Sequence, residues 1–142
     1  MSYARHCGGL FLILTLLFGS LSSAHAQTLT PIHITVDCSD VGAVAGFWSA
    51  ALQRPVDSQS EEVAEIPGGG TGSSGWLFIS VPERKTAKNR LHIDFGTADR
   101  AAEVARLLAL GASRIGDYDE WGAVWTTLAD VEGNEFCVVQ RS

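Results

Sequence analysis

Apolar and polar residues alternate along two stretches of the chain, and this alternation predicts two β-strands of similar character. Residues 32–38 place Ile34, Val36 and Cys38 on one side and His33, Thr35 and Asp37 on the other; residues 90–95 place Leu91, Ile93 and Phe95 opposite Arg90, His92 and Asp94. A period of two sends successive side chains to opposite faces of a strand. Each strand is therefore expected to pack one apolar face and to expose a polar face that carries a histidine.

Each of these strands is followed by an aspartate and then by apolar residues at helical spacing. Asp40 precedes a segment that ends near Leu52, with Pro55 just beyond it, and Asp99 precedes a segment that ends at Gly111. Aspartate is a favoured N-cap, and glycine is a common terminator of helices. We therefore predict an amphipathic helix after each strand.

The remaining apolar runs predict three short strands after each helix. They are two strands within 56–66 and one at 76–81 in the first half, then 113–116, 123–128 and 136–140 in the second. The order βαβββ thus occurs twice, and such a repeat fixes the architecture. We predict an α+β fold of two modules, at about 31–82 and 89–141, whose histidines face one another across a shared pocket.

The first 26 residues have the pattern of a secretory signal peptide. Arg5 and His6 precede an uncharged apolar run from Leu10 to Leu21, and residues 22–26 supply small residues for cleavage before Gln27. That order is typical of export. A membrane anchor is the alternative, but about 12 apolar residues fall short of the ~20 that span a bilayer. We predict a periplasmic or secreted domain of residues 27–142, with no membrane association after cleavage.

The predicted mature chain is acidic and contains two cysteines. Nine Lys and Arg residues stand against 16 Asp and Glu residues once Arg5 is removed. An acidic surface without a basic cluster argues against nucleic acid as a partner. The alternation places Cys38 on the helix side of its strand and Cys137 on the opposite, polar side of another. We therefore expect two free thiols.

Four motifs together resemble the vicinal-oxygen-chelate superfamily, which includes glyoxalase I, extradiol dioxygenases and bleomycin-binding resistance proteins. They are Asp37–Asp40 with Phe47, Trp48 and Leu52; Asn89–Asp94; Leu107–Ala112; and Asp130–Cys137. The likeness is greatest to small bacterial glyoxalase-like domains and spans the mature chain in family order. It implies that two βαβββ modules form a cup-shaped half-barrel with the helices outside. It also implies a small-molecule ligand, and members often form homodimers.

The resemblance also implies a set of cup-lining positions that hold a metal ion in some members. By this correspondence His33, His92 and Cys137 occupy three of the four positions, and Ser80, or Phe78 after a two-residue slip, occupies the other. Two imidazoles and a thiol suit a divalent ion, zinc first among them. A cup that binds no metal is an equal alternative.

Further cup residues are candidates for catalysis and for ligand binding. Asp94 and Glu135 would handle protons, and Asp37 would join a ligand pocket with an aromatic wall drawn from Trp76, Phe78, Trp121 and Trp125. Two functions remain open: a glyoxalase-like lyase, isomerase or oxygenase, or a non-catalytic protein that sequesters a small molecule. Glyoxalase I chemistry itself is not expected, because no carboxylate occupies a predicted ligand position.

Overall fold

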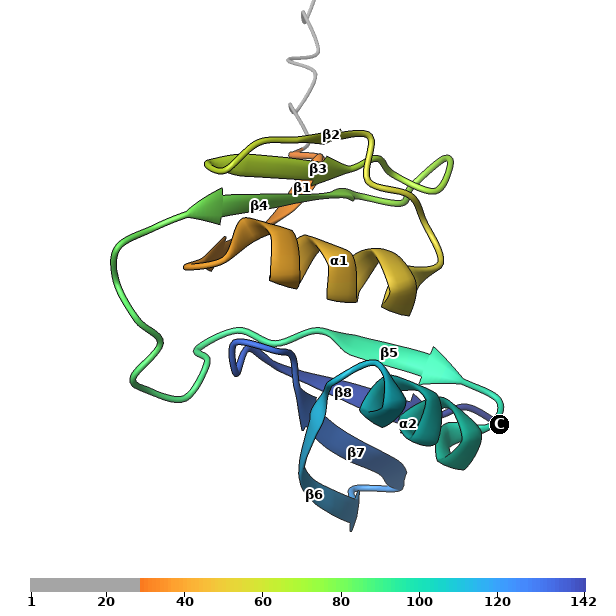
Figure 1. The fold of residues 1–142 in the computed structure, drawn as a ribbon. Helices are drawn as coiled ribbons and strands as arrows, with labels where there is room; N and C mark the ends of the chain where they lie inside the picture. Colours follow the sequence, from red (N-terminus) through yellow and green to blue (C-terminus); the bar gives the residue numbers. More distant parts are fainter. Residues whose placement is uncertain (1–28) are drawn as a thin grey trace, which may run out of the picture.

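A computed structural model describes residues 29–142, which form two βαβββ modules (Figure 1). The first module contains β1 (His33–Cys38), α1 (Val41–Leu52), β2 (Ser58–Gln59), β3 (Val63–Ile66) and β4 (Gly75–Ser80). The second contains β5 (Asp94–Thr97), α2 (Arg100–Ala109), β6 (Ser113–Glu120), β7 (Ala123–Ala129) and β8 (Glu135–Gln140). The predicted α+β fold is confirmed. The predicted signal peptide lies outside the described residues.

Both helices begin where the sequence places an aspartate. The carboxylate of Asp40 accepts a hydrogen bond from the backbone N–H of Ala43 at 2.9 Å, and that of Asp99 accepts one from Ala102 at 3.0 Å. These bonds satisfy donors that the first turn of a helix leaves free. The chain leaves α2 through Gly111, whose φ of +109° is readily adopted only by glycine.

Each module forms its own four-stranded sheet. The strand order is β1-β4-β3-β2 in the first sheet and β5-β8-β7-β6 in the second, with β1–β4 and β5–β8 parallel and the other pairs antiparallel. Strand β6 continues to Glu120, four residues beyond the predicted end at Gly116. Most of β6 is exposed, so no apolar alternation marked its second half.

The hydrophobic core lies between the two modules. Helix α1 runs between the sheets (Figure 1), and the ring of Trp48 lies 4.4 Å from that of Trp76 in the first sheet and 5.0 Å from that of Phe136 in the second. Phe95 joins the same cluster, 6.2 Å from Trp76. The two sheets therefore turn their helix-packed faces toward each other.

The opposite faces of the sheets, called here the cup faces, consequently point away from each other. Phe95 and Phe136 lie in the core, so their strand neighbours Asp94 and Cys137 project from the other side of the second sheet. His33 projects in the same way from the first sheet. The prediction that His33 shares one pocket with the second module of its own chain is therefore wrong, because the packing of α1 separates the two cup faces.

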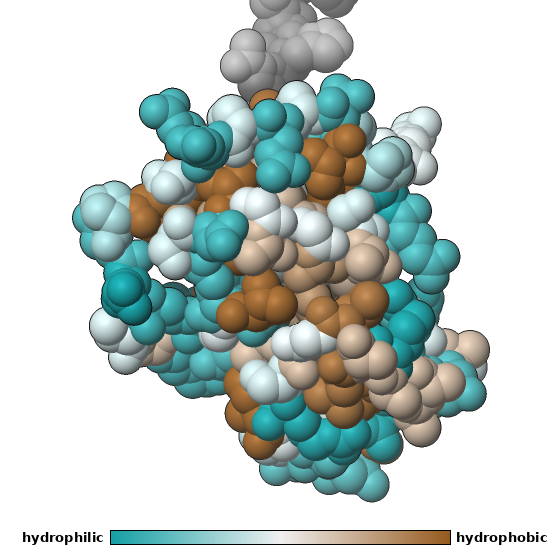
Figure 2. Space-filling model, viewed as in Figure 1, coloured by the Kyte–Doolittle hydropathy of each residue, from teal (hydrophilic) through white to brown (hydrophobic). Residues whose placement is uncertain are grey.

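Hydrogen bonds connect the two modules across this core. The buried carboxylate of Asp130, after β7, accepts a hydrogen bond from the indole N–H of Trp48 at 3.0 Å. Glu132 accepts from the backbone N–H groups of Ser39 and Asp40 at 2.8 and 2.6 Å, at the start of α1. Arg106 of α2 donates to two carbonyls at the end of α1. Apolar residues gather near the boundary between the modules (Figure 2). A cleft of about 360 Å³ opens there between α1, β5 and α2.

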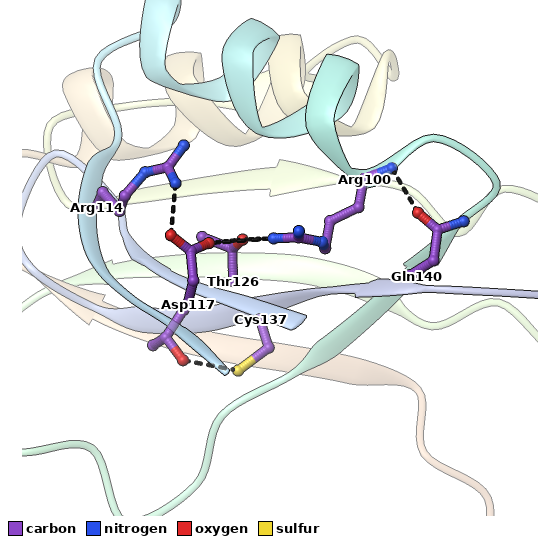
Figure 3. Close-up of polar contacts among 7 residues, drawn as sticks. Arg100, Arg114, Asp117, Thr126, Cys137 and Gln140 are labelled. Atoms are coloured by element: carbon purple, nitrogen blue, oxygen red, sulfur yellow. Dashed lines mark hydrogen bonds and ion pairs between the residues drawn. The ribbon is translucent and has the colours of Figure 1, made fainter. Parts of the chain in front are cut away.

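A second polar network occupies the helix-packed face of the second sheet. In Figure 3 the guanidinium of Arg100 donates to the hydroxyl of Thr126, and both groups donate to one carboxylate oxygen of Asp117. Arg114 donates to the other oxygen of Asp117 at 2.7 Å. The hydrogen bonds from Thr126 and Arg114 lower the pKa of Asp117.

No helix in the described part of the chain is long and apolar enough to span a membrane.

Candidate functional site in the cup of the second sheet

The cup face of the second sheet contains a hollow of about 400 Å³. It is bounded by residues of β5, β6, β7 and β8, by the β6–β7 turn and by the connection between the modules. The lining residues are Lys88, His92, Asp94, Tyr118, Trp121, Ala123, Trp125, Thr127, Glu135, Cys137 and Val139. Of the predicted site residues, the hollow therefore brings together His92, Asp94, Glu135, Cys137, Trp121 and Trp125.

His92, Asp94 and Cys137 form a compact group at one end of the hollow. Asp94 is paired with Cys137 across the parallel strands, and His92 precedes Asp94 by two residues, so all three project from one face. The imidazole Nε2 lies 3.3 Å from the Asp94 carboxylate. One donor atom from each of the three side chains lies within 4.8 Å of the other two. This is the only such group of three among residues 29–142.

Cys137 forms the base of this group and is 4% exposed. Its sulfur lies 3.4 Å from the hydroxyl of Thr127, and burial raises the pKa of the thiol. Figure 3 shows Cys137 on the side of the sheet opposite to Thr126. Cys38 lies in the core, where burial raises its pKa to about 11. Both thiols are free, as predicted.

Glu135 is engaged by two lysines from the connection between the modules. The ammonium of Lys88 lies 2.5 Å from one carboxylate oxygen, and that of Lys85 lies 3.8 Å from the other. The hydrogen bond from Lys88 lowers the pKa of Glu135. A lowered pKa makes a carboxylate a weaker base. Asp94, which no lysine contacts, is therefore the better placed of the two predicted proton-handling residues.

Three aromatic rings form a continuous stack along the other side of the hollow. The ring of Trp125 lies 5.2 Å from that of Tyr118 and 6.0 Å from that of Trp121, with interplanar angles of 15° and 17°. Trp121 is 92% exposed and has a φ of +53°, a left-handed conformation that is unusual for a bulky residue. With Gly122 at a φ of +78°, it forms the tight turn between β6 and β7.

The first sheet places the other predicted residues elsewhere. The imidazole of His33 lies 3.2 Å from Glu65 and lies across Gly75, where a Cβ atom would be 2.8 Å from the ring. Asp37 borders a separate shallow hollow beside the connection between the modules. Neither residue belongs to the hollow of the second sheet.

The sequence placed the wrong face of β4 toward the cup. Thr35 pairs with Leu77, just as Asp94 pairs with Cys137, so Leu77 occupies the position equivalent to Cys137. Trp76 and Phe78 are buried in the core, and Ser80 lies on the same side of β4 as they do. These three residues therefore do not line a ligand pocket, because a shift of one residue exchanges the two faces of a strand.

Five residues of the hollow were absent from the predicted set: Lys88, Tyr118, Ala123, Thr127 and Val139. Tyr118 was missed because β6 was expected to end before it. Thr127 was missed although its alternation with Trp125 along one strand places both on the same face. Lys88 was expected in a solvated connection, and only the tertiary structure brings it to Glu135.

With this geometry in place, comparison with known proteins identifies the family. The family model for the glyoxalase-like domain matches residues 33–139, so the chain belongs to this family and to the vicinal-oxygen-chelate superfamily. Comparison with curated protein sequences gives no significant match.

Solved structures share the fold at low sequence identity. A glyoxalase-related enzyme from Fulvimarina pelagi is 15% identical with a TM-score of 0.63, covering 82% of this chain and 89% of its own. A glyoxalase/bleomycin resistance protein/dioxygenase family enzyme from Burkholderia phytofirmans PsJN is 17% identical with a TM-score of 0.64, covering 79% and 98%. A bleomycin-binding protein in complex with bleomycin is 15% identical with a TM-score of 0.57, covering 82% and 100%. At these identities the likeness is one of fold.

Proposed function

We propose that this protein is an exported small-molecule-binding protein and that its ligand is a planar aromatic compound held in the cup of the second sheet. The observation that carries the proposal is the stack of Tyr118, Trp125 and Trp121 along the hollow. Stacked aromatic rings offer a flat apolar surface to a further ring. Trp121 exposes nearly all of its side chain, so this end of the stack is open to a ligand.

The dimensions and chemistry of the hollow fit this class of ligand. A volume of about 400 Å³ lies within the range of pockets that bind small molecules, roughly 300–1,000 Å³. The wall of aromatic rings faces a polar group formed by His92, Asp94 and Cys137. A mostly apolar surface with a few polar groups is the usual composition of such sites. The bleomycin-binding protein of the same fold supports a binding role.

Export of the protein belongs to the same proposal. It is supported by the basic, apolar and small-residue segments of residues 1–26, in the order of a signal peptide. Mass spectrometry of the protein recovered from the periplasm or medium of an expressing bacterium tests it. We expect an N-terminus at Gln27, and a chain found intact in the cytoplasm would overturn export.

We further propose that the chain forms a homodimer. Ile32 and Leu91 each precede the histidine of their module, and they are 73% and 81% exposed. Large apolar residues exposed at equivalent positions of two modules favour a self-complementary interface. Sedimentation equilibrium would then give a dimer that Leu91→Ser weakens, and a monomer at all concentrations would exclude this interface.

Fluorescence titration tests the binding function. The probe is 9-aminoacridine, a planar aromatic compound, and the readout is quenching of tryptophan emission. Loss of one stacked ring removes about 0.5–1.5 kcal/mol, so Trp121→Ala is expected to raise the Kd about two- to thirteenfold. Ile115→Ala, which changes an exposed apolar residue of strand β6 outside the hollow, is the control. Equal binding by both variants, or no binding by the wild type, would overturn the proposal.

A second candidate function is a metal-dependent enzyme of the glyoxalase-like class. The group of His92, Asp94 and Cys137 favours it, because imidazole, carboxylate and thiol are all metal ligands. A bound divalent ion would act as a Lewis acid toward an oxygen of the substrate. If Asp94 binds the ion, its carboxylate can no longer act as a base. Glu135, the other predicted proton-handling residue, is engaged by Lys88. Turnover of small oxygenated aldehydes or catechols that depends on His92 would establish this function.

A further inference from the structure

A glycine inside strand β5 marks a close approach on the cup face of the second sheet. Gly96 follows Phe95, which packs against the core, so the position of its missing side chain is on the cup face with Asp94. A Cβ atom at Gly96 would overlap with Cδ of Arg141 and lie 2.8 Å from its Cγ. Glycine within a strand is often found where another group approaches closely. Gly96 therefore leaves room for the side chain of Arg141 to lie flat on the sheet.

The backbone of Arg141 is anchored beside the hollow. Its N–H donates to the carbonyl of Thr97 at 2.8 Å, which continues the pairing of β5 and β8 just past the end of β8. Arg141 follows Val139 by two positions, and Val139 lines the hollow. Residues two apart in an extended chain lie on the same face. The contact with Gly96 agrees with this placement, so Arg141 extends the floor of the hollow toward β5.

The strand register brings Arg141 to the end of the hollow at which Trp121 is exposed. Val139 pairs with Trp125, so the same register places Arg141 opposite Ala123, which also lines the hollow. Ala123 begins β7 directly after the turn that carries Trp121. Arg141 and Trp125 are diagonal neighbours on one face, which are about 7–8 Å apart and within reach of long and aromatic side chains. A ligand held by the aromatic stack therefore lies close to Arg141.

The guanidinium of Arg141 has no ionic partner in the part of the chain that the structure describes. All three arginines between β5 and β8 pair with a carboxylate, whereas Arg141 forms no ion pair within residues 29–142. The nearby charges of the hollow are already engaged, because Lys88 binds Glu135 and the carboxylate of Asp94 lies 3.3 Å from the imidazole of His92. Arg141 is therefore available to an anionic group of a ligand.

We propose that Arg141 binds an anionic substituent of the ligand and that the protein therefore selects planar aromatic carboxylates. The inference rests on the proposed function, because it takes the aromatic stack as the surface that holds the ring. A carboxylate on the edge of a ring at the exposed end of the stack would reach Arg141. A guanidinium suits this anion, since its planar fork donates two parallel hydrogen bonds to one carboxylate.

Three planar tricyclic probes of different charge test the inference. They are anthracene-2-carboxylate, its neutral carboxamide and the cationic 9-aminoacridine, each titrated against the protein by quenching of tryptophan emission. The wild type should bind the carboxylate more tightly than the carboxamide. Arg141→Gln should raise the Kd of the carboxylate about fivefold, a magnitude typical of an ion pair at an exposed site, and leave that of the carboxamide unchanged within about twofold.

Two control variants separate this contact from general effects of charge. Arg114→Gln removes one positive charge from the opposite face of the same sheet and should leave the affinities for all three probes unchanged within about twofold. Lys88→Gln combined with Glu135→Gln removes both charges of the ion pair beside the hollow and should preserve the preference for the carboxylate. Circular dichroism of each variant verifies folding.

The results distinguish failure of this inference from failure of the proposed function. Equal effects of Arg141→Gln and Arg114→Gln on carboxylate binding would overturn the inference. A preference that survives Arg141→Gln but is lost in the double variant would do so as well, because the carboxylate would then bind Lys88. In either case, binding of 9-aminoacridine that depends on Trp121 would leave the proposed function standing. If none of the three probes binds, the proposed function fails and the inference fails with it.

Discussion

Replacement of Asp130 by alanine should destabilise the protein strongly, because this carboxylate joins the two modules from a buried position. Asp130 is 3% exposed. One of its oxygens accepts the indole N–H of Trp48 at 3.0 Å, and the other accepts the backbone N–H groups of Glu132 and Asn134 at 3.0 and 2.9 Å. The amide of Asn134 also donates to it. In Asp130→Ala, all these donors lose their acceptor.

The magnitude follows from the surroundings of each donor. A buried donor without an acceptor costs about 1–3 kcal/mol. The indole of Trp48 lies in the core and cannot reach water, whereas the turn around Glu132 and Asn134 is only half-buried and can partly rehydrate. We therefore expect Asp130→Ala to lower the free energy of unfolding by about 3 kcal/mol, and Trp48→Phe to lower it by about 1–2 kcal/mol.

Urea denaturation followed by circular dichroism measures both values. A double-mutant cycle should give a coupling energy of about 1 kcal/mol between Asp130 and Trp48. Asp119→Ala, which removes an exposed carboxylate from β6, is the control and should change the stability by less than about 0.5 kcal/mol. If Asp130→Ala also lowers the free energy of unfolding by less than about 0.5 kcal/mol, or if the coupling energy is zero, the contact of Asp130 with Trp48 does not hold the modules together.

Three further outcomes are expected. The hydrogen bond from Arg106 lowers the pKa of Glu103 from its ordinary 4.5, so this pair stabilises the fold above pH 4.5 and its contribution is lost as the pH falls through the lowered value. Glu103→Gln should therefore lose less stability in acid than the wild type. Thermal unfolding between pH 6 and pH 3 measures this difference. With Cys7→Ser in place, a thiol reagent should titrate Cys38 and Cys137 only after denaturation without reductant, and one disulfide in place of two thiols would refute the prediction. Gly122→Ala should cost about 1 kcal/mol in unfolding free energy, since φ is +78° there, and a neutral effect would argue against the tight turn that presents Trp121.

Local features of the sequence determined the helices and strands and much of the site in the cup of the second sheet. Alternation in the strands and an aspartate before each helix predicted both modules, and the same alternation placed His92, Asp94 and Cys137 on one face. These inferences succeed because the period of a strand and the cap of a helix depend on residues close together in the chain.

The tertiary structure alone decided how the cup faces of the two modules lie relative to each other. The separation of His33 from His92 depends on the packing of Trp48 against both sheets, and the pairing of Thr35 with Leu77 depends on the register of a distant strand. The engagement of Glu135 by Lys88 joins residues 47 positions apart. No local pattern encodes such contacts, because they arise when the hydrophobic faces of whole elements are buried together, and a register shift of one residue would reverse which face each side chain occupies.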